Sequence, residues 1–481
     1  MSEATKPILA VDLDGTLIAS DMLHESFWAV LGSDRVAVLK AMHDFLTGGR
    51  ARLKATLAEA AEVDVSALPY KEVVLDEIRS RKATGAHVVL ATASDQGIAE
   101  KVADHLGLFD EVIASDGTTN LKADAKAEAL TEKFGDKGFA YIGDSAADLP
   151  VWAASGEAIS VDASEALKGR ISTDLVTHLE STAAPKGAAR ATLRALRPHQ
   201  WLKNLLIFIP MLLAHDVTGA SLMAAFAAFV SFSLTASSVY VLNDLLDLSA
   251  DRAHSRKKMR PFASGALPLA SGLLLAPGLL ALGVLVGSIA GPLFLGVLAF
   301  YYLCTLAYSL ALKRVTVIDI CMLAGLYTLR VIAGAAATGN PPSVWLLGFS
   351  IFFFLALAAV KRQAELVDLV ARGDAAAAGR GYLPEDLAII TMMGLSAGYV
   401  SVLVAGLYLT SDAVAELYSF PSALWGICAV LIYWLSRIVM LTHRARMHDD
   451  PIVFAVTDKV SLMCGAAIIA LAVLAARGLT V

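Results

Sequence analysis

The chain has 481 residues, of which 57% are hydrophobic and only 17% are charged, and its net charge is −6. Soluble globular proteins carry about one quarter charged residues, so this composition excludes a wholly soluble chain and indicates that much of it lies in lipid. No basic surface runs through the chain, which disfavours a nucleic-acid-binding protein. Residues 1–180 have the mixed charge of a soluble domain, whereas residues 200–481 are apolar blocks separated by short polar loops.

Three short β-rich segments of the first half end in polar side chains. They are residues 8–18 (ILAVDLDGTLI), 87–94 (HVVLATAS) and 140–148 (AYIGDSAAD). Helical segments, such as 95–106 and 122–134, separate them. Alternating strands and helices predict a parallel sheet with right-handed crossovers. In such sheets the functional site lies beyond the carboxyl ends of the strands, where these polar side chains occur.

Two carboxylates, Asp12 and Asp14, follow the first predicted strand. At a strand end both can reach one bound substrate. Together with Asp144 they form an all-oxygen set suited to Mg²⁺. Asp12 could act as a nucleophile that forms an aspartyl-phosphate. Asp14 could protonate the leaving oxygen and then activate water.

These segments resemble, in order, the four motifs of the haloacid dehalogenase superfamily: DLDGT, the Thr in LATAS, a following lysine, and GDSAAD. The resemblance implies an α/β fold with a Rossmann-like parallel sheet and a phosphatase activity. It implies that Thr92 holds the phosphate and that Lys126, or alternatively Lys122, is the motif lysine. The implied metal-site acids are Asp12, Asp14, Asp144 and Asp148.

The rest of the first half suggests a domain boundary. Residues 20–80 are mostly amphipathic helix and fall where this superfamily inserts a small helical cap. We therefore expect a phosphatase domain at 1–180, a linker at 181–196 and a membrane domain at 197–481. The start of the chain lacks a basic region followed by an apolar stretch, so we expect no cleaved signal peptide.

The second half predicts an all-α membrane domain of nine transmembrane helices, because a span needs about 20 apolar residues. The first is marginal, and an amphipathic helix at the membrane interface is the alternative for it. The candidates lie near 202–218, 221–243, 269–290, 292–312, 317–338, 343–361, 386–409, 421–441 and 460–478.

Basic residues alternate between the predicted loops. The loops after spans 2, 4, 6 and 8 are rich in Lys and Arg, and those after spans 1, 3, 5 and 7 hold none. The positive-inside rule places the basic loops in the cytoplasm. We therefore expect a multi-pass protein of the cytoplasmic (inner) membrane, with the first domain and both active sites facing the cytoplasm and the C-terminus outside.

An acidic segment follows span 2, in VLNDLLDLSADRAHSRKKMRP (241–261). Asn243, Asp247 and Asp251 recur every four residues, and Asp244 lies three before Asp247, so on a helix they share one face. Carboxylates crowded in this way would repel one another, and a divalent cation carrying a diphosphate would remove the conflict. The basic residues that follow could hold phosphate oxygens.

Other polar groups are predicted on the same side. They occur in RPHQWLKN (197–204), YSLALKR (308–314), VKRQAEL (360–366) and HDDPIVFAVTD (448–458). Arg330 lies inside span 5, where an internal polar cavity is the default explanation. Acids for a metal and bases for phosphate would thus surround one cavity that faces the cytoplasm.

NDLLDLSADR resembles the NDxxDxxxDR motif of the UbiA superfamily of intramembrane prenyltransferases. RPHQWLKN, HSRKKMRP and KRQAEL bring the chain closer to one branch, the decaprenyl-phosphate phosphoribosyltransferases. The resemblance implies that Asp244, Asp247 and Asp251 are catalytic and, with Asn243, hold Mg²⁺ and a diphosphate. The expected substrate-binding residues are Lys203, Asn204, Asn243, Arg252, Lys257, Lys258, Arg260, Tyr308, Lys313, Arg330, Lys361, Arg362, Glu365 and Asp450.

The sequence departs from the common prenyltransferase pattern in one place. A DxxxD motif is expected after span 6, but that position reads KRQAELVD. The departure puts a second metal cluster of the usual kind in doubt, and with it aromatic prenylation. A Lys-Arg pair suits an additional phosphate, and both phosphoribosyl pyrophosphate and polyprenyl phosphate carry one.

The two halves together predict a bifunctional, Mg²⁺-dependent membrane enzyme. The second half would transfer phosphoribose from phosphoribosyl pyrophosphate to a polyprenyl (decaprenyl) phosphate. The first would remove the sugar 5-phosphate, giving polyprenyl-phosphoryl ribose for cell-envelope glycan synthesis. One alternative is a prenyltransferase that moves a polyprenyl group to an aromatic or other polar acceptor; another is a transporter or scaffold with a regulatory phosphatase. A homo-oligomer is compatible with the sequence.

Overall fold

The structure is a computed structural model that falls into two compact units. The sheet unit comprises residues 1–196 with 240–277, and the helical unit comprises residues 197–239 with 278–481. The residues described are 6–116, 120–173, 175–181, 187–254, 257–373, 381–447 and 450–477.

The sheet unit is built on six parallel strands in the order β3-β2-β1-β4-β5-β6. β1 lies in the middle, between β2 and β4, so the chain segments that leave these three strands meet at one edge of the sheet. The parallel α/β architecture predicted from the sequence is confirmed. The strands are β1 (Ile8–Val11), β2 (His87–Asp95), β3 (Glu111–Ser115), β4 (Phe139–Gly143), β5 (Glu157–Val161) and β6 (Leu175–Leu179).

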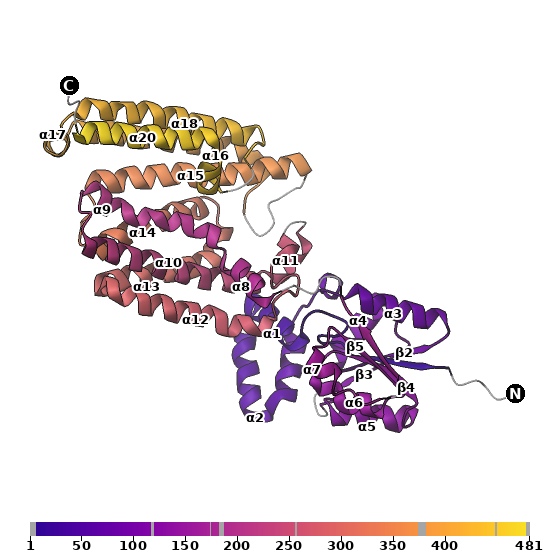
Figure 1. Cartoon of the computed structure of the whole chain (residues 1–481). Helices are drawn as coiled ribbons and strands as arrows, with labels where there is room; N and C mark the ends of the chain where they lie inside the picture. Colours follow the sequence, from indigo (N-terminus) through magenta and orange to yellow (C-terminus); the bar gives the residue numbers. More distant parts are fainter. Residues whose placement is uncertain are drawn as a thin grey trace. The chain divides into compact units, whose positions relative to one another are not determined.

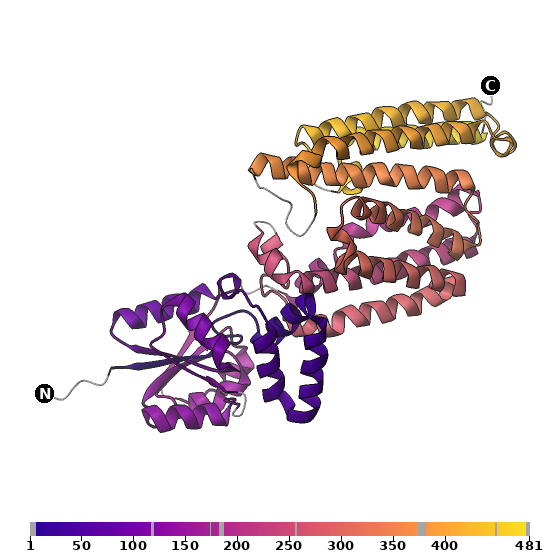
Figure 2. The same ribbon diagram turned by 180° about the vertical axis from the view of Figure 1, so that it is seen from behind.

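Helices cover both faces of this sheet (Figures 1 and 2). Alternate strand residues point to opposite faces. Val11 therefore packs with α3 and α4 in one core, whereas Ala10 packs with α5 and α6, including the fully buried Trp152, in the other. The helices are α3 (Glu72–Ala83), α4 (Gln96–Leu106), α5 (Asp124–Phe134), α6 (Leu149–Ala154) and α7 (Glu165–Lys168).

Two helices, α1 (Met22–Ser33) and α2 (Arg35–Ala60), form a helical hairpin inserted between β1 and α3. Asp21 begins α1 by accepting hydrogen bonds from the first free N–H groups. α2 bends at Gly49, whose φ of 71° lies in the left-handed region. The hairpin falls within the stretch 20–80 in which a cap was expected, while the end of that stretch belongs to α3 and to the sheet core.

The stretch expected to be a linker is partly helical, because it contains α8 (Ala188–Leu196). Beyond it, eight helices of the described residues are long and apolar enough to cross a membrane. In the helical unit, consecutive long helices from α13 onward pack side by side (Figure 1). The long helices are α10 (Gly219–Leu246), α12 (Leu269–Gly287), α13 (Pro292–Leu310), α14 (Ile318–Thr338), α15 (Val344–Arg372), α16 (Leu387–Leu409), α18 (Trp425–His443) and α20 (Lys459–Arg477).

The first expected span has a different structure. It consists of η3 (Pro198–Phe208), a 3-10 helix, followed by the short α9 (Ile209–Leu213). Each begins with a proline at its first or second position, where the missing N–H is tolerated. Pro210 cannot donate the hydrogen bond that a helix continuing from η3 would need, so no single long α-helix forms here.

A glycine allows η3 to pack closely on α14. A Cβ added to Gly334 would lie 2.7 Å from the carbonyl carbon of Ile207 and would overlap its oxygen. We predict that Gly334→Ala separates the two elements and costs about 2 kcal/mol or more of stability, as overpacking does in cores. Thermal unfolding in detergent measures the loss.

Gly325→Ala is the matched control, because Gly325 lies on the same helix and a Cβ there meets nothing within 4 Å. Alanine is the better helix former by about 1 kcal/mol, so this variant should unfold at the wild-type temperature or above it. Equal losses in the two variants would contradict the close packing described here.

Candidate functional sites

Three acidic side chains meet at the carboxyl edge of the sheet. Asp12 follows β1, and Asp144 and Asp148 follow the adjacent strand β4. One carboxylate oxygen from each lies within 4.8 Å of the others. Among the residues that the structure describes, this is the only group of three or more Asp, Glu, His or Cys side chains so placed. Such an oxygen set fits Mg²⁺.

Lys126, from α5, contacts this three-acid group. Its Nζ lies 2.7 Å from Asp12 Oδ1 and 2.9 Å from the Tyr141 hydroxyl, which in turn donates to Asp148 Oδ1 at 2.8 Å. Lys126 is buried, whereas Lys122 is exposed. Of the two lysines considered from the sequence, the structure brings Lys126 to the acids.

Asp148 is held mainly by the protein itself. Its Oδ2 accepts from the backbone N–H groups of Asp144 and Ser145, at 3.2 and 3.0 Å, and its Oδ1 accepts from Tyr141. Both oxygens are thus engaged in orienting the turn after β4. Asp12 and Asp144 are therefore the better candidates for direct metal ligands, with Asp148 positioning Asp144.

Asp14 lies apart from the three-acid group. Its Oδ2 accepts from Ser94 Oγ at 2.6 Å, and its Oδ1 accepts from the backbone N–H of Met22, the first residue of α1, at 2.7 Å. The structure therefore does not bring the Asp14 carboxylate into the metal group expected from the sequence. Thr92, fully buried in the second half of β2, accepts from the backbone N–H of Ser94 at 3.0 Å.

Burial controls the charge of these acids. It raises the pKa of Asp12 to about 7, although Lys126 opposes the shift. It raises the pKa of Asp144 to about 6, and the nearby Asp148 adds to this increase. Burial and the neighbouring Asp21 also raise the pKa of Asp14. A buried carboxyl with a raised pKa can carry a proton near neutral pH, as a general acid requires.

Two contributors to this site were missed from the sequence. Tyr141 lies inside β4 and is not among the residues expected at the site, but its hydroxyl joins Lys126 to Asp148. A buried tyrosine hydroxyl needs a polar partner, and that need was the available signal. Thr16, which donates to Asp144 Oδ1 at 3.1 Å, stands in the DLDGT motif, but no residue pattern indicated its partner.

The acidic segment, residues 243–251, begins in the last turn of α10 and keeps a helical pattern of hydrogen bonds. The Asp247 N–H donates to the Asn243 carbonyl at 2.9 Å, and the Asp251 N–H donates to the Asp247 carbonyl at 2.8 Å. The backbone leaves helical geometry only at Asp247, with φ −102° and ψ 19°, so α10 ends at Leu246 and α11 (Leu248–Ala253) begins. The four-residue spacing of the polar side chains is therefore kept.

Arg260 links two acids of this segment. Its Nη1 lies 3.2 Å from Asp244 Oδ1 and 2.6 Å from Asp251 Oδ2, and both carboxylates are buried. Burial raises the pKa of Asp251, with Arg260 opposing the shift. Lys257 and Lys258 are exposed in η4 (Lys257–Met259). The acids are thus partly neutralised by a side chain that was itself expected to bind phosphate.

Arg252 has a different partner from the one expected. Instead of pointing into the acidic segment, its guanidinium pairs with Glu25 of α1 and donates to the Ala263 carbonyl at 3.0 Å. Both members of the pair are buried within the sheet unit. The role in substrate binding predicted for Arg252 therefore has no support in this geometry.

In the helical unit, Asp450 forms ion pairs with two lysines. Its Oδ2 lies 2.6 Å from Lys203 Nζ and 3.1 Å from Lys361 Nζ, and the Tyr327 hydroxyl lies 3.3 Å from both of its oxygens. Burial alone would raise the pKa of Asp450, but Lys361 and Lys203 hold it well below its usual value. One carboxylate between two ammonium groups leaves a net positive charge that suits an anion.

Arg330 lies beside this cluster, buried among aromatic rings. Its Nε donates to Asn204 Oδ1 at 2.8 Å, and its Nη2 donates to the Tyr301 hydroxyl at 3.1 Å. Its guanidinium carbon lies 5.1 to 5.7 Å from the ring centres of Phe232, Tyr301 and Tyr327. Cation–π contacts and amide oxygens thus hold a charge that lipid would not accept. Tyr327 connects the Arg330 and Asp450 clusters.

A third cluster surrounds Asp319, at the start of α14. Arg362 Nη2 lies 2.8 Å from Asp319 Oδ2, the Tyr308 hydroxyl donates to Asp319 Oδ1 at 2.7 Å, and Glu365 pairs with Arg362. The sequence predicts that the neighbouring residues Lys361 and Arg362 bind phosphate. Arg362 instead forms a buried ion pair with Asp319, whereas 29% of the Lys361 side chain is exposed. Lys313 lies in η6 (Leu312–Arg314) and is half-buried.

Two family profiles match the chain. The profile of the UbiA prenyltransferase family covers residues 205–476, and that of the haloacid dehalogenase-like hydrolases covers residues 9–152. The chain is 38% identical over 463 residues to the uncharacterized protein y4nM of Sinorhizobium fredii, covering 96% of this chain and 89% of that protein. The fusion of the two domains is therefore shared with this relative.

The second half is also similar to a named enzyme. It is 39% identical over 203 residues to the decaprenyl-phosphate phosphoribosyltransferase of Mycolicibacterium smegmatis, a match that covers 40% of this chain and 63% of that protein. A solved UbiA homolog from Archaeoglobus fulgidus, bound to DMAPP and Mg²⁺, aligns with a TM-score of 0.47 and 17% identity, covering 58% of this chain and 98% of that chain.

Two glycines provide a test of the three-acid group. Gly15 and Gly85 both have positive φ, +76° and +88°, so replacing either by Ala should impose a similar backbone strain of about 1 kcal/mol. Only at Gly15 would the added Cβ approach the site, 2.5 Å from Asp144 Oδ2. We predict that Gly15→Ala lowers hydrolysis of p-nitrophenyl phosphate by about tenfold or more, because Asp144 must move.

Gly85→Ala should retain nearly full hydrolysis, because its Cβ meets nothing within 4 Å. Thermal unfolding of both variants confirms that the comparison is made on folded protein. If the two variants lose activity equally, the position of Asp144 does not govern the reaction.

Proposed function

Because the chain belongs to the UbiA prenyltransferase family and carries a haloacid dehalogenase-like hydrolase domain at its N-terminus, we propose that it performs two consecutive reactions on one membrane lipid. The first transfers phosphoribose from phosphoribosyl pyrophosphate to a polyprenyl phosphate. The second hydrolyses the 5-phosphate of the attached sugar. The observation that carries the proposal is the fusion of a phosphatase-type acid group to a phosphoribosyltransferase-like membrane half in one chain.

The donor in the first reaction is proposed from two features. The first is the identity of 39% to an enzyme named decaprenyl-phosphate phosphoribosyltransferase. The second is the lysine pair around Asp450, because Lys203 and Lys361 can turn from that carboxylate toward a phosphate. In the proposed step a phosphate oxygen of the lipid attacks C1 of the ribose, and diphosphate leaves.

The acidic segment would hold the leaving diphosphate. Asp244, Asp247 and Asp251 follow one another along a helical path, and Arg260 already bridges two of them. When bound here and at the three-acid group, Mg²⁺ would neutralise phosphate oxygens and so make the leaving groups better. Arg260 would then be released to contact the diphosphate directly.

The second reaction would use the sheet edge. The Asp12 carboxylate attacks the phosphorus of the 5-phosphate and forms an aspartyl-phosphate, while Asp14 donates a proton to the leaving sugar oxygen. Asp14, now ionised, takes a proton from water, which attacks the aspartyl-phosphate and releases inorganic phosphate. Lys126, 2.7 Å from Asp12, would bind the phosphoryl oxygens as charge develops. The products are polyprenyl-phosphoryl ribose and phosphate.

The charge pattern supports a cytoplasmic location for both reactions. The loop after α10 is basic, so the positive-inside rule assigns it to the cytoplasm. Glu25 of the hydrolase domain pairs with Arg252 in that loop, so both lie on one side of the membrane. Residues 197–218 must then cross before α10 begins, although they form no long α-helix, and nine crossings would leave the C-terminus outside.

Prenyl transfer is the second candidate, because it is the activity after which the family is named. In that reaction the acidic segment would hold the diphosphate of a prenyl donor through Mg²⁺. An aromatic or other polar acceptor would attack C1 of the prenyl group, and diphosphate would leave. KRQAEL in place of an acidic motif on α15 favours phosphate recognition instead. Membranes that label lipid from a prenyl diphosphate but not from phosphoribosyl pyrophosphate would establish this alternative.

Two substitutions separate the proposed reactions. Asp247→Asn should abolish formation of any ribosylated lipid, because it removes a carboxylate that would bind the diphosphate through Mg²⁺, yet it should leave hydrolysis of p-nitrophenyl phosphate intact. Asp12→Asn should do the reverse, so that the 5-phosphorylated lipid accumulates. Mass spectrometry of the lipids made from phosphoribosyl pyrophosphate and polyprenyl phosphate reads both outcomes. Loss of the same step in both variants would refute the division of labour.

Lys126 in α5 and Lys122, two residues before this helix, give a sharper test of the phosphatase site. Lys126→Ala should lower hydrolysis of p-nitrophenyl phosphate by about 100-fold, as loss of a preorganised charge beside the reacting group does. Lys122→Ala is the control, because this side chain is exposed, and it should stay close to wild type. A larger effect at Lys122 would mean that the wrong lysine has been assigned.

A further inference from the structure

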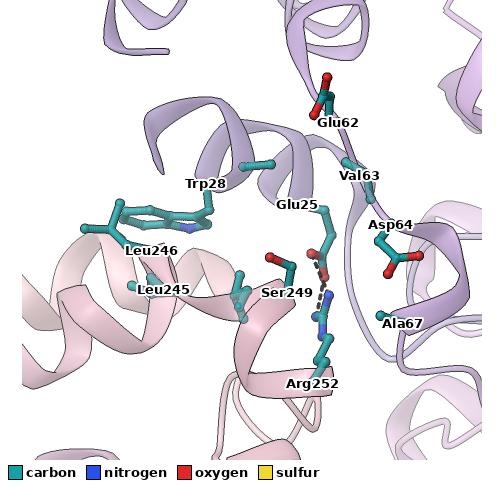
Figure 3. Close-up of a pocket in the computed structure, with 12 residues that line it drawn as sticks. Glu25, Trp28, Glu62, Val63, Asp64, Ala67, Leu245, Leu246, Ser249 and Arg252 are labelled. Atoms are coloured by element: carbon teal, nitrogen blue, oxygen red, sulfur yellow. Dashed lines mark hydrogen bonds and ion pairs between the residues drawn. The ribbon is translucent and has the colours of Figure 1, made fainter. Parts of the chain in front are cut away.

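The helical hairpin of the hydrolase domain is joined to α11 by a buried ion pair. Arg252 donates from Nη1 to Glu25 Oε2 at 2.9 Å and from Nη2 to Glu25 Oε1 at 2.6 Å (Figure 3). The two side chains are only 7% and 4% exposed. A bidentate pair buried to this extent is strongly disfavoured unless both partners are present and aligned. The ion pair therefore fixes α1 and α11 in one relative position.

Close packing surrounds the ion pair. Trp28 of α1 lies over Leu245 and Leu246 at the end of α10 (Figure 3). A Cβ added to Gly265, whose φ is +73°, would lie 2.7 Å from the Cβ of Ala19 and still closer to its carbonyl oxygen. Only glycine allows the loop after the acidic segment to come this near to the loop after β1.

The cavity left between these elements is too small for a substrate. It measures about 50 Å³ and is lined by α1, the residues around Asp64, and the helix ends near Ser249. This volume holds a few water molecules. The region is thus a packed contact surface, which we call the hairpin junction: residues 19–32 and 62–67 against 245–252 and 263–265.

The hairpin junction lies close in sequence to the contact of Asp14 with α1 and to the acidic segment. On one side, Met22 at the start of α1 donates to Asp14, and Glu25 follows three residues later. On the other side, Arg252 directly follows Asp251, which is bound by Arg260. Arg252 is held by Glu25 and directly follows Asp251 in α11, so the ion pair fixes the position of the backbone next to Asp251.

We propose that Glu25 is a positioning residue for the transfer reaction. By holding Arg252, the hydrolase hairpin keeps α11 in the orientation in which Asp247 and Asp251 can bind a metal–diphosphate group. The hairpin thus has a role in the transfer reaction, separate from a role as cap of the phosphatase site: it orients the acidic segment. The identity of the ligand of the acidic segment rests on the proposed function. The effect of Glu25 on this segment rests only on the contacts of the hairpin junction.

Charge reversal tests the coupling in the full-length protein. The affinity for inorganic pyrophosphate with Mg²⁺ is measured by calorimetry in an Asp12→Asn background to silence hydrolase turnover. The part of this binding that Asp247→Asn abolishes reports on the acidic segment, whichever transfer it serves. Glu25→Gln should weaken this affinity by about tenfold or more, because Arg252 loses its charged partner. Arg252→Glu should weaken it further through repulsion from Glu25. The double reversal, Glu25→Arg with Arg252→Glu, should bind at least tenfold more tightly than Arg252→Glu alone.

Glu157→Gln is the matched control. Glu157 forms another bidentate pair in the same unit, with Arg81 at 2.7 and 2.9 Å, far along the sheet from the junction. It should leave pyrophosphate binding unchanged, and thermal unfolding should show all variants folded. The proposal is overturned if Glu25→Gln binds like wild type while folded, if Glu157→Gln weakens binding equally, or if the double reversal restores nothing.

An assay of ribosylated-lipid formation distinguishes failure of the Glu25 proposal from failure of the proposed function. If wild-type protein binds pyrophosphate but forms no ribosylated lipid, the substrate assignment fails while the coupling can still be measured. If ribosylated lipid forms and Glu25→Gln raises the KM for phosphoribosyl pyrophosphate more than it lowers kcat, the positioning role is supported. A fall in kcat alone with unchanged KM would contradict it.

Discussion

Burial of charge is the constraint on which this structure depends. A lone ion in a low-dielectric interior is costly, so each buried charge described here comes with partners of opposite charge or with aligned dipoles. Lys126 is paired with Asp12, and Arg362 with Asp319. Arg330, placed in a long apolar helix, is held by an amide oxygen and aromatic rings. The same paired charges therefore stabilise the fold and form the candidate sites.

Partial neutralisation is also what makes these groups suitable for phosphate chemistry. Arg260 bridges two buried carboxylates, and Lys203 shares one carboxylate with a second lysine. In each case the protein supplies an internal counter-charge that a metal ion or a phosphate can replace. Exchange of one partner for another costs less than exposing an unpaired charge, so substrate binding can proceed without unfolding the site. The Glu25–Arg252 pair of the hairpin junction follows the rule that a buried charge keeps an opposite partner, and it does so within the sheet unit.

Much of the architecture follows from sequence patterns, because strands, spans and strand-end acids are encoded locally. The position of Asp12 and Asp144 at one sheet edge follows from the parallel topology. The pairing of Glu25 with Arg252 does not, because 227 residues separate them and no periodicity links them. Arg252 stands in NDLLDLSADR, and the resemblance of this motif predicts a role in substrate binding instead. The close approach of residues 198–208 to Gly334 does not follow from the sequence either, because hydrophobic periodicity does not record which helix a segment packs against.

The central claim, that transfer and hydrolysis act in sequence on one lipid, can be tested with a doubly labelled donor. Phosphoribosyl pyrophosphate carrying ³²P at the 5-phosphate and ³H in the ribose is incubated with the wild-type protein, Mg²⁺ and polyprenyl phosphate. The account predicts lipid that gains both labels transiently and then keeps ³H while ³²P appears as inorganic phosphate. Lipid that keeps both labels indefinitely, or ³²P released before any lipid is labelled, would contradict it.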